Sequence, residues 1–125
     1  MKLFTVEEAN ALLPMARRIL IKIQRAHGIV VSYKKDAEKA AAMAIVGGGG
    51  MQGGTNYLIA LTELADQTNK LDSIGIQLKD FDLGLIDFPS MRDGRIVLLC
   101  WKLGEGDQIE WWHDLEAGYA GRQPL

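Results

Sequence analysis

The chain has 125 residues, 48% of them hydrophobic, and a formal net charge of −2. This length suits one domain with its own core, and the nearly balanced charge argues against a general attraction to nucleic acid or to a membrane surface. No apolar run is long enough to span a bilayer, the start MKLFTVEEAN lacks the features of a signal peptide, and a single cysteine, Cys100, cannot form an internal disulfide. We therefore expect a cytoplasmic protein.

The first predicted element is a long helix over residues 1–46. Thr5 followed by Glu8 is a capping-box pattern, and Pro14 predicts a kink because it removes a backbone donor. The helix register passes unchanged through Gly28, which favours one continuous helix. Its apolar residues recur in alternating steps of four and three, the pattern of a coiled-coil seam: they are Leu12, Ala16, Ile19, Ile23, Ala26, Val30, Tyr33, Ala37, Ala40 and Ala44.

Residues 47–54, GGGGMQGG, predict a flexible loop before a second helix over residues 55–75. Gly48, Gly50 and Gly53 spell GxGxxG, but a predicted helix precedes them where a dinucleotide fingerprint needs a strand. A linker is therefore favoured over a phosphate-binding loop.

The two predicted helices form an antiparallel hairpin, since a short connection joins matching apolar seams. At about 1.5 Å per residue the first helix is about 50 Å long or more, and the second only about 25 to 30 Å. Part of the first seam thus needs cover from the sheet or from a second copy of the chain. We expect a homodimer through the first helix.

Charge is distributed unevenly along the chain. Arg18, Lys22 and Arg25 share one face of the first helix, whereas residues 76–125 hold nine acids against five bases. These opposite charges can meet within the chain or across a dimer, or the three cations can form an anion-binding stripe. Nucleic-acid binding by the same cations is disfavoured by the net charge.

From residue 76 the pattern becomes that of short strands at 76–79, 83–88, 95–103 and 109–113, separated by the turns PSMRDG and GEGD. These segments predict an antiparallel meander of three to four strands, so the fold class is α+β. RIVLLCWKL is apolar on both faces and is the predicted central strand, with Cys100 an inert buried thiol.

The end of the last predicted strand gathers residues that bind metals or move protons. His113, Asp114 and Glu116 lie within four positions, and Asp87 completes a possible set of ligands for a divalent metal. Local hydrogen bonds of these side chains are the favoured alternative, because a metal site normally needs three or more protein ligands.

Three arginines of the same region are candidates for an anionic ligand. Arg92 and Arg95 flank a turn, and Arg122 lies in the tail. For Arg122 the favoured role is a bridge to Asp87 or Asp114 that ties the tail down.

Three stretches resemble one known family. KLFTVEEANALLP, IQLKDFDLGLIDFPSMRDGRIVLLCWKLGE and WHDLEAGYAGRQPL are similar to bacterial proteins of the domain-of-unknown-function family 2203. The resemblance implies no activity, but any shared site is expected among the residues that match the family pattern, which are Asp87, Phe88, Pro89, Gly94, Arg95, Trp101, His113, Glu116, Gly118, Gly121, Arg122 and Pro124.

Two functional hypotheses follow. The favoured one is a non-catalytic homo-oligomer that binds a protein partner or small anionic ligand at the sheet end, with Arg122 and His113. The alternative is a metal-dependent hydrolase in which His113, Asp114, Glu116 and Asp87 hold the ion and Arg122 orients the substrate. No cofactor other than such a metal is expected.

Overall fold

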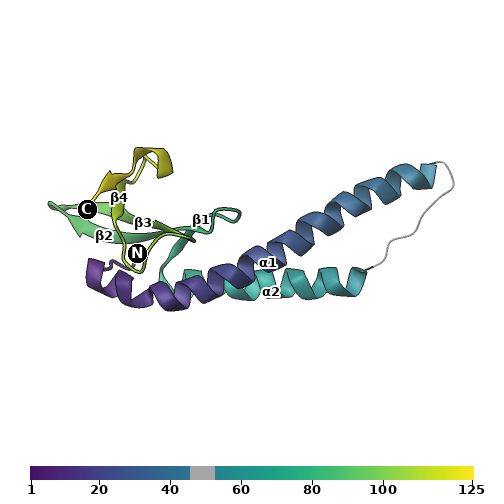
Figure 1. Cartoon of the computed structure of the whole chain (residues 1–125), viewed down its shortest axis with the longest axis horizontal. Helices are drawn as coiled ribbons and strands as arrows, with labels where there is room; N and C mark the ends of the chain where they lie inside the picture. The colour runs from purple at the N-terminus through teal and green to yellow at the C-terminus, as the bar shows by residue number, and fades with distance from the viewer. Residues whose placement is uncertain (46–52) are drawn as a thin grey trace.

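The computed structural model describes residues 1–45 and 53–125. Two helices pack as a hairpin and an antiparallel sheet follows, which confirms the α+β fold with one strand more than expected. The elements are α1 (Val6–Ile45), α2 (Gly54–Ile74), β1 (Gln77–Asp80), β2 (Leu85–Arg92), β3 (Arg95–Lys102), β4 (Trp111–Asp114), the short 3₁₀ helix η1 (Tyr119–Gly121) and β5 (Gln123–Pro124). The five strands lie side by side in chain order at one end of the hairpin (Figure 1). Most of the glycine-rich loop, with Gly48 and Gly50, lies outside the described residues.

Helix α1 begins at the predicted capping box. The Thr5 N–H donates to Glu8 Oε1 at 2.9 Å, and the Glu8 N–H donates to Thr5 Oγ1 at 3.1 Å. The hydrogen bond from the Thr5 backbone lowers the pKa of the Glu8 carboxyl. The helix then runs through Pro14 and Gly28 without a break.

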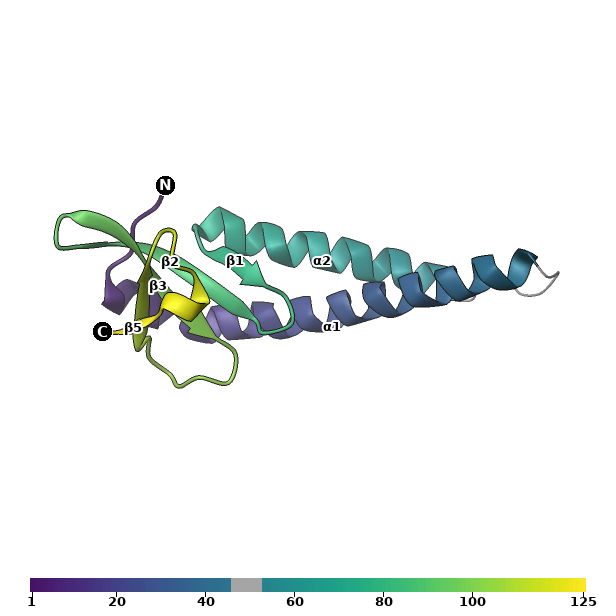
Figure 2. The same cartoon turned by 90° about the horizontal axis from the view of Figure 1, so that it is seen from above.

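The main core lies between the sheet and the N-terminal half of α1. Leu13, Ala16, Leu20 and Ile23 of α1 are fully buried, and they pack on the face of the sheet that we call the inner face. Figures 1 and 2 both place this half of α1 against the sheet. The inner-face residues of the core are Ile86, Phe88, Val97, Leu99, Trp101 and Trp112. The sheet therefore covers the first part of the seam, so no second copy is needed there.

A smaller core joins the two helices farther along the hairpin. Ala26 and Val30 of α1 pack with Ala60 of α2, and the rings of Tyr33 and Tyr57 stack 4.2 Å apart. Beyond this point α1 continues past the start of α2 (Figure 1). Within the described ranges, neither helix is long and apolar enough to cross a bilayer.

Strand β2 extends farther than the sequence predicted, because Pro89 lies inside it rather than in a turn. The Pro89 carbonyl points away from β3 and accepts from the Phe4 N–H at 2.7 Å. Since the N and O of one strand residue point to the same side, the missing N–H of Pro89 removes no hydrogen bond to β3. The turn itself consists of Asp93 and Gly94, with φ of 51° and 77°, as a two-residue hairpin of type I′ requires.

Candidate functional site

Three reactive side chains share the outer face of the sheet, the face turned away from α1. In the register of the strands Asp87 lies opposite Cys100, and His113 lies opposite Leu98, the next outer-face position of β3. The exposed fractions are 1% for Asp87, 0% for Cys100 and 2% for His113. We call these three residues the buried cluster.

The hydrogen-bond partners of His113 indicate which of its ring nitrogens carries a proton. Its Nδ1 lies 2.7 Å from the backbone oxygen of Asp114, and its Nε2 lies 3.1 Å from both carboxylate oxygens of Asp87. A carbonyl oxygen only accepts, so Nδ1 carries a proton and donates it. In a neutral imidazole Nε2 would then present a lone pair to a carboxylate, which is repulsive. The contact between Nε2 and Asp87 is therefore favourable only with a proton or another cation between them.

The Cys100 thiol is unsuited to nucleophilic chemistry. Burial, and secondly the Asp87 charge, raise the pKa of Cys100 to about 12, so without a bound metal ion the thiol stays protonated at neutral pH. A catalytic Cys–His–Asp arrangement needs the thiol and the carboxylate on different ring nitrogens. Here Nδ1 of His113 is already bonded to a backbone carbonyl. These observations agree with the expectation of an inert core thiol.

We expect Cys100 in the folded protein to resist alkylation. With a pKa about four to five units above a working pH of about 7.5, roughly one thiol in ten thousand or fewer is ionised, and the thiolate is the reactive form. Iodoacetamide should label Cys100 only as fast as the chain unfolds, as mass spectrometry would show. The same protein in guanidinium chloride is the control and should react fully. Labelling of the folded protein at the rate of a free cysteine would contradict the structure.

Arg122 ties the C-terminal tail to the sheet. Its guanidinium bonds to Glu105 and lies 4.8 Å from the ring centres of both Trp111 and Tyr119. The predicted bridge to Asp87 or Asp114 is therefore wrong. The turn after β3 explains the difference, since a hydrogen bond from the Lys102 N–H to Glu105 Oε1 at 2.8 Å holds the Glu105 carboxylate within reach of the tail.

A shallow cavity of about 390 Å³ adjoins this arginine. Arg122 and Glu105 already bond to each other there, so their charges are largely satisfied. The lining residues are Lys102, Glu105, Trp111, Tyr119, Ala120 and Arg122.

The other predicted ligands do not join the buried cluster. Asp114 follows His113 in β4, so its side chain points to the inner face, where Arg95 bonds to it at 3.1 Å. Glu116 is exposed in the turn after β4. Of the four predicted metal ligands, the structure brings together only Asp87 and His113.

Arg92 and Arg95 lie beside Trp112 at the inner-face end of the β2–β3 hairpin. Their guanidinium carbons are 4.8 Å and 5.8 Å from the Trp112 ring centre. Arg95 also bonds to Asp114, whereas Arg92 has no ion pair with any residue that the structure describes. The end of the sheet therefore presents two stacked arginines and one acid.

Two residues of these candidate sites were missed in the sequence: Cys100 as a neighbour of Asp87, and Glu105 as the partner of Arg122. The alternation of RIVLLCWKL, combined with a hairpin turn at Asp93 and Gly94, places Cys100 opposite Asp87 and could have revealed the first. No pattern signals the second.

The basic face of α1 meets the acidic loops of the sheet at two points. Arg17 bonds to Asp107 at 3.2 Å, and His27 lies 3.7 Å from Asp82. The predicted stripe itself, Arg18, Lys22 and Arg25, is exposed and makes no ion pair within residues 1–45 and 53–125.

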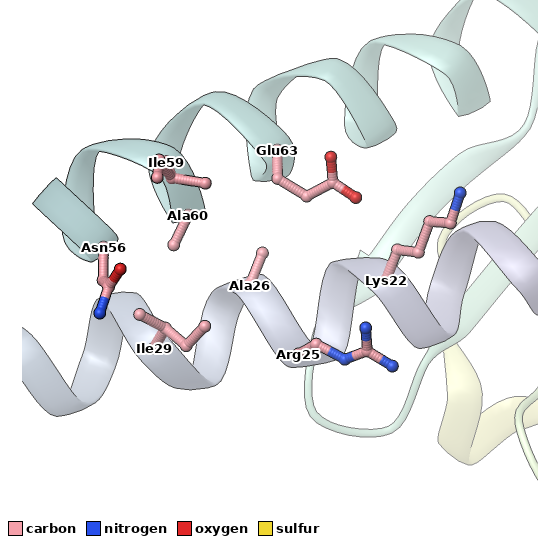
Figure 3. Close-up of a pocket in the computed structure, with 8 residues that line it drawn as sticks. All are labelled: Lys22, Arg25, Ala26, Ile29, Asn56, Ile59, Ala60 and Glu63. Carbon is pink, nitrogen blue, oxygen red and sulfur yellow. The ribbon is translucent and has the colours of Figure 1, made fainter.

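Two cations of that stripe border a groove of about 360 Å³ between α1 and α2, which we call the hairpin groove. Figure 3 shows Ala26 and Ala60 facing each other across it. Lys22 and Glu63 lie toward one end, and Ile29 and Asn56 toward the other (Figure 3). The lining residues are Lys22, Arg25, Ala26 and Ile29 of α1 and Asn56, Ile59, Ala60 and Glu63 of α2.

The sequence of this α+β chain, a helical hairpin followed by a five-stranded sheet, matches a known family. The family model described as "Uncharacterized conserved protein (DUF2203)" covers residues 2–125, and the chain belongs to this family. Neither the curated proteins nor the solved structures contain a match.

Proposed function

We propose that this protein is a non-catalytic homodimer assembled through the hairpin groove, with a binding surface for a small anion at each sheet end. The dimer is proposed because the surface around the hairpin groove (Figure 3) is apolar and exposed. Cations border this surface on α1, and acids border it on α2.

The apolar part of this surface is unusually exposed. Leu58 and Ile59 of α2 are 63% and 61% exposed, and Ile29 of α1 is 42% exposed. Lys22 and Arg25 border these residues on the α1 side. On the α2 side Glu63 and Asp66 line a neighbouring hollow together with Leu58 and Ile59. Large apolar side chains gathered within a charged border are typical of an interaction surface.

A second copy of the chain is the occupant that this charge arrangement favours. A two-fold axis along the groove would place α2 of each copy over α1 of the other. Glu63, which lies across the groove toward the same end as Lys22 and Arg25 (Figure 3), would then meet Lys22 and Arg25 of the other copy. The same contact forms twice, as a symmetric interface requires.

The proposed dimer interface therefore differs from the seam that the sequence predicted. Ile19 and Ile23, the middle of the seam predicted on the first helix, are buried against the chain's own core, at 7% and 0% exposure. The surface left for a partner includes α2 as well as α1.

Replacing Ile59 with Asp should convert the dimer to monomer. Burying one Ile contributes about 1.5–3 kcal/mol, and the contact occurs twice in the dimer, so the dissociation constant should rise about 100-fold or more. Light scattering should give twice the chain mass of 13.8 kDa for the unchanged protein and one chain mass for Ile59→Asp. Met91→Asp is the matched control, because Met91 is 54% exposed but lies in β2, away from the groove. A monomeric unchanged protein would refute the proposal.

The anion surface rests on Arg92, with Arg95 beside it. Stacking on Trp112 fixes the Arg92 guanidinium while its N–H edges remain free for a planar or phosphate-like anion. Inorganic pyrophosphate should therefore change the tryptophan fluorescence, and Arg92→Gln should weaken its binding about 10- to 100-fold. Lys79→Gln, at an exposed position of β1, should have no effect. Equal binding by all three proteins would exclude this surface.

The four metal ligands of the hydrolase hypothesis do not converge on one point. A catalytic centre of His113, Asp114 and Glu116 would require side chains from opposite faces of β4 to converge. Asp114 instead bonds to Arg95 on the inner face.

A further inference from the structure

Two hydrogen-bond acceptors face each other inside the buried cluster. Nδ1 of His113 donates to the Asp114 carbonyl at 2.7 Å, which leaves the lone pair of a neutral imidazole on Nε2. That lone pair points at both oxygens of Asp87, each 3.1 Å away. Only a cation between them makes the contact favourable, and this cation is either a proton or a metal ion.

A third donor lies beside these two. The Sγ of Cys100, a carboxylate oxygen of Asp87 and a ring nitrogen of His113 all lie within 4.8 Å of one another. Ca²⁺ and Mg²⁺ select oxygen ligands, whereas a set of sulfur, nitrogen and oxygen suits Zn²⁺ and Co²⁺. The chemistry of the donors therefore favours a transition metal.

We infer that Asp87, Cys100 and His113 form a structural site for one Zn²⁺-type ion that joins strands β2, β3 and β4. Cys100 takes the place that the sequence assigned to Asp114 and Glu116. The inference does not depend on the proposed dimer, because the cluster lies on the sheet and the hairpin groove lies between the helices.

Geometry and charge both support the inference. Metal–nitrogen and metal–oxygen bonds of about 2.1 Å at a tetrahedral angle hold N and O about 3.4 Å apart, so the observed 3.1 Å needs to widen by only a few tenths of an ångström. The second oxygen of Asp87 is equally close to Nε2, so the carboxylate can bind the ion through either oxygen. One thiolate, one carboxylate and a neutral imidazole balance a divalent ion, as a buried site requires.

The surroundings of His113 also match a metal ligand. A coordinating histidine ordinarily donates its other ring N–H to a carbonyl or carboxylate, and Nδ1 of His113 does this to Asp114. Binding the ion releases two protons, one from the Cys100 thiol and one shared by Asp87 and His113.

Cobalt provides a direct test. The chain is unfolded with chelator, freed of metal, and refolded with Co²⁺ alone, since the cluster is buried in the folded protein. We expect about one Co²⁺ per chain, with visible bands of tetrahedral cobalt and a near-ultraviolet band from thiolate to cobalt. Cys100→Ser should lose the near-ultraviolet band. His27→Gln, which changes the other histidine of the chain, should keep it.

The outcomes are decisive even if a variant fails to fold. The spectrum of the unchanged protein alone overturns the inference if the thiolate band is missing at saturating Co²⁺, and the cation in the cluster is then a proton. Retention of the band in folded Cys100→Ser would also overturn it. A chain that is monomeric but shows the band would refute the dimer and leave the metal site standing.

Discussion

Replacing Asp87 with Ala should lower the free energy of unfolding by about 3–5 kcal/mol. The substitution leaves His113 buried beside no carboxylate, and removing one member of a buried charged pair costs about this much. Both side chains are at most 3% exposed, so water cannot compensate. Urea unfolding at one fixed protein concentration, with EDTA to exclude metal, measures the change.

Two controls show whether the pair itself carries the effect. Asp114→Ala breaks the more exposed pair with Arg95 and should cost no more than about 1 kcal/mol. The double variant Asp87→Leu with His113→Leu should lose about 1–3 kcal/mol less stability than the sum of the losses in the single variants Asp87→Leu and His113→Leu. Strictly additive losses would mean that Asp87 and His113 do not interact.

Trp101→Ala should also destabilise the protein by about 3–5 kcal/mol, in this case because it removes a side chain from the core on the inner face of the sheet. Trp101 is 1% exposed in the central strand, and its Nε1–H donates to the Gly106 carbonyl at 3.0 Å. The substitution opens a large cavity and removes the bond that holds the following turn. The same urea experiment checks it, with Met91→Ala at an exposed position of β2 as the control, expected within about 0.5 kcal/mol. A loss below about 1 kcal/mol would contradict the burial of this ring.

The helices were predictable because their signals are local. The Thr5 and Glu8 capping box sets the start of α1, and the seam spacing carries the helix through Gly28. What covers the seam is a tertiary property. Ile23 belongs to the same pattern as Val30, yet one packs in the core with the sheet and the other against α2.

The ends of the strands were predicted less well. Pro89 suggested a turn, because proline usually leaves a strand. It stays within β2 since its carbonyl bonds to Phe4, a residue 85 positions away in the sequence. The short strand β5 depends in the same way on pairing with Trp111 and Trp112, which no local pattern of two residues can indicate.

The candidate site was predicted in part. Asp87 and His113 meet as the metal hypothesis required, because their strands β2 and β4 flank β3 and present both side chains on one face. Asp114 was grouped with His113 by closeness in the sequence, but alternate residues of a strand point in opposite directions. Arg122 needed a three-dimensional partner, and the turn that holds Glu105 provides it.

The most direct test of the proposed dimer mixes two variants with reversed charges. Glu63→Lys makes both sides of the groove positive, and the double variant Lys22→Glu with Arg25→Glu makes both negative, so each alone should be monomeric. Mixed in equal amounts, they restore every opposite-charge contact, and sedimentation should show a heterodimer of twice the chain mass of 13.8 kDa. If the mixed variants sediment as two separate monomers, or if each variant alone remains dimeric, assembly through the hairpin groove is contradicted.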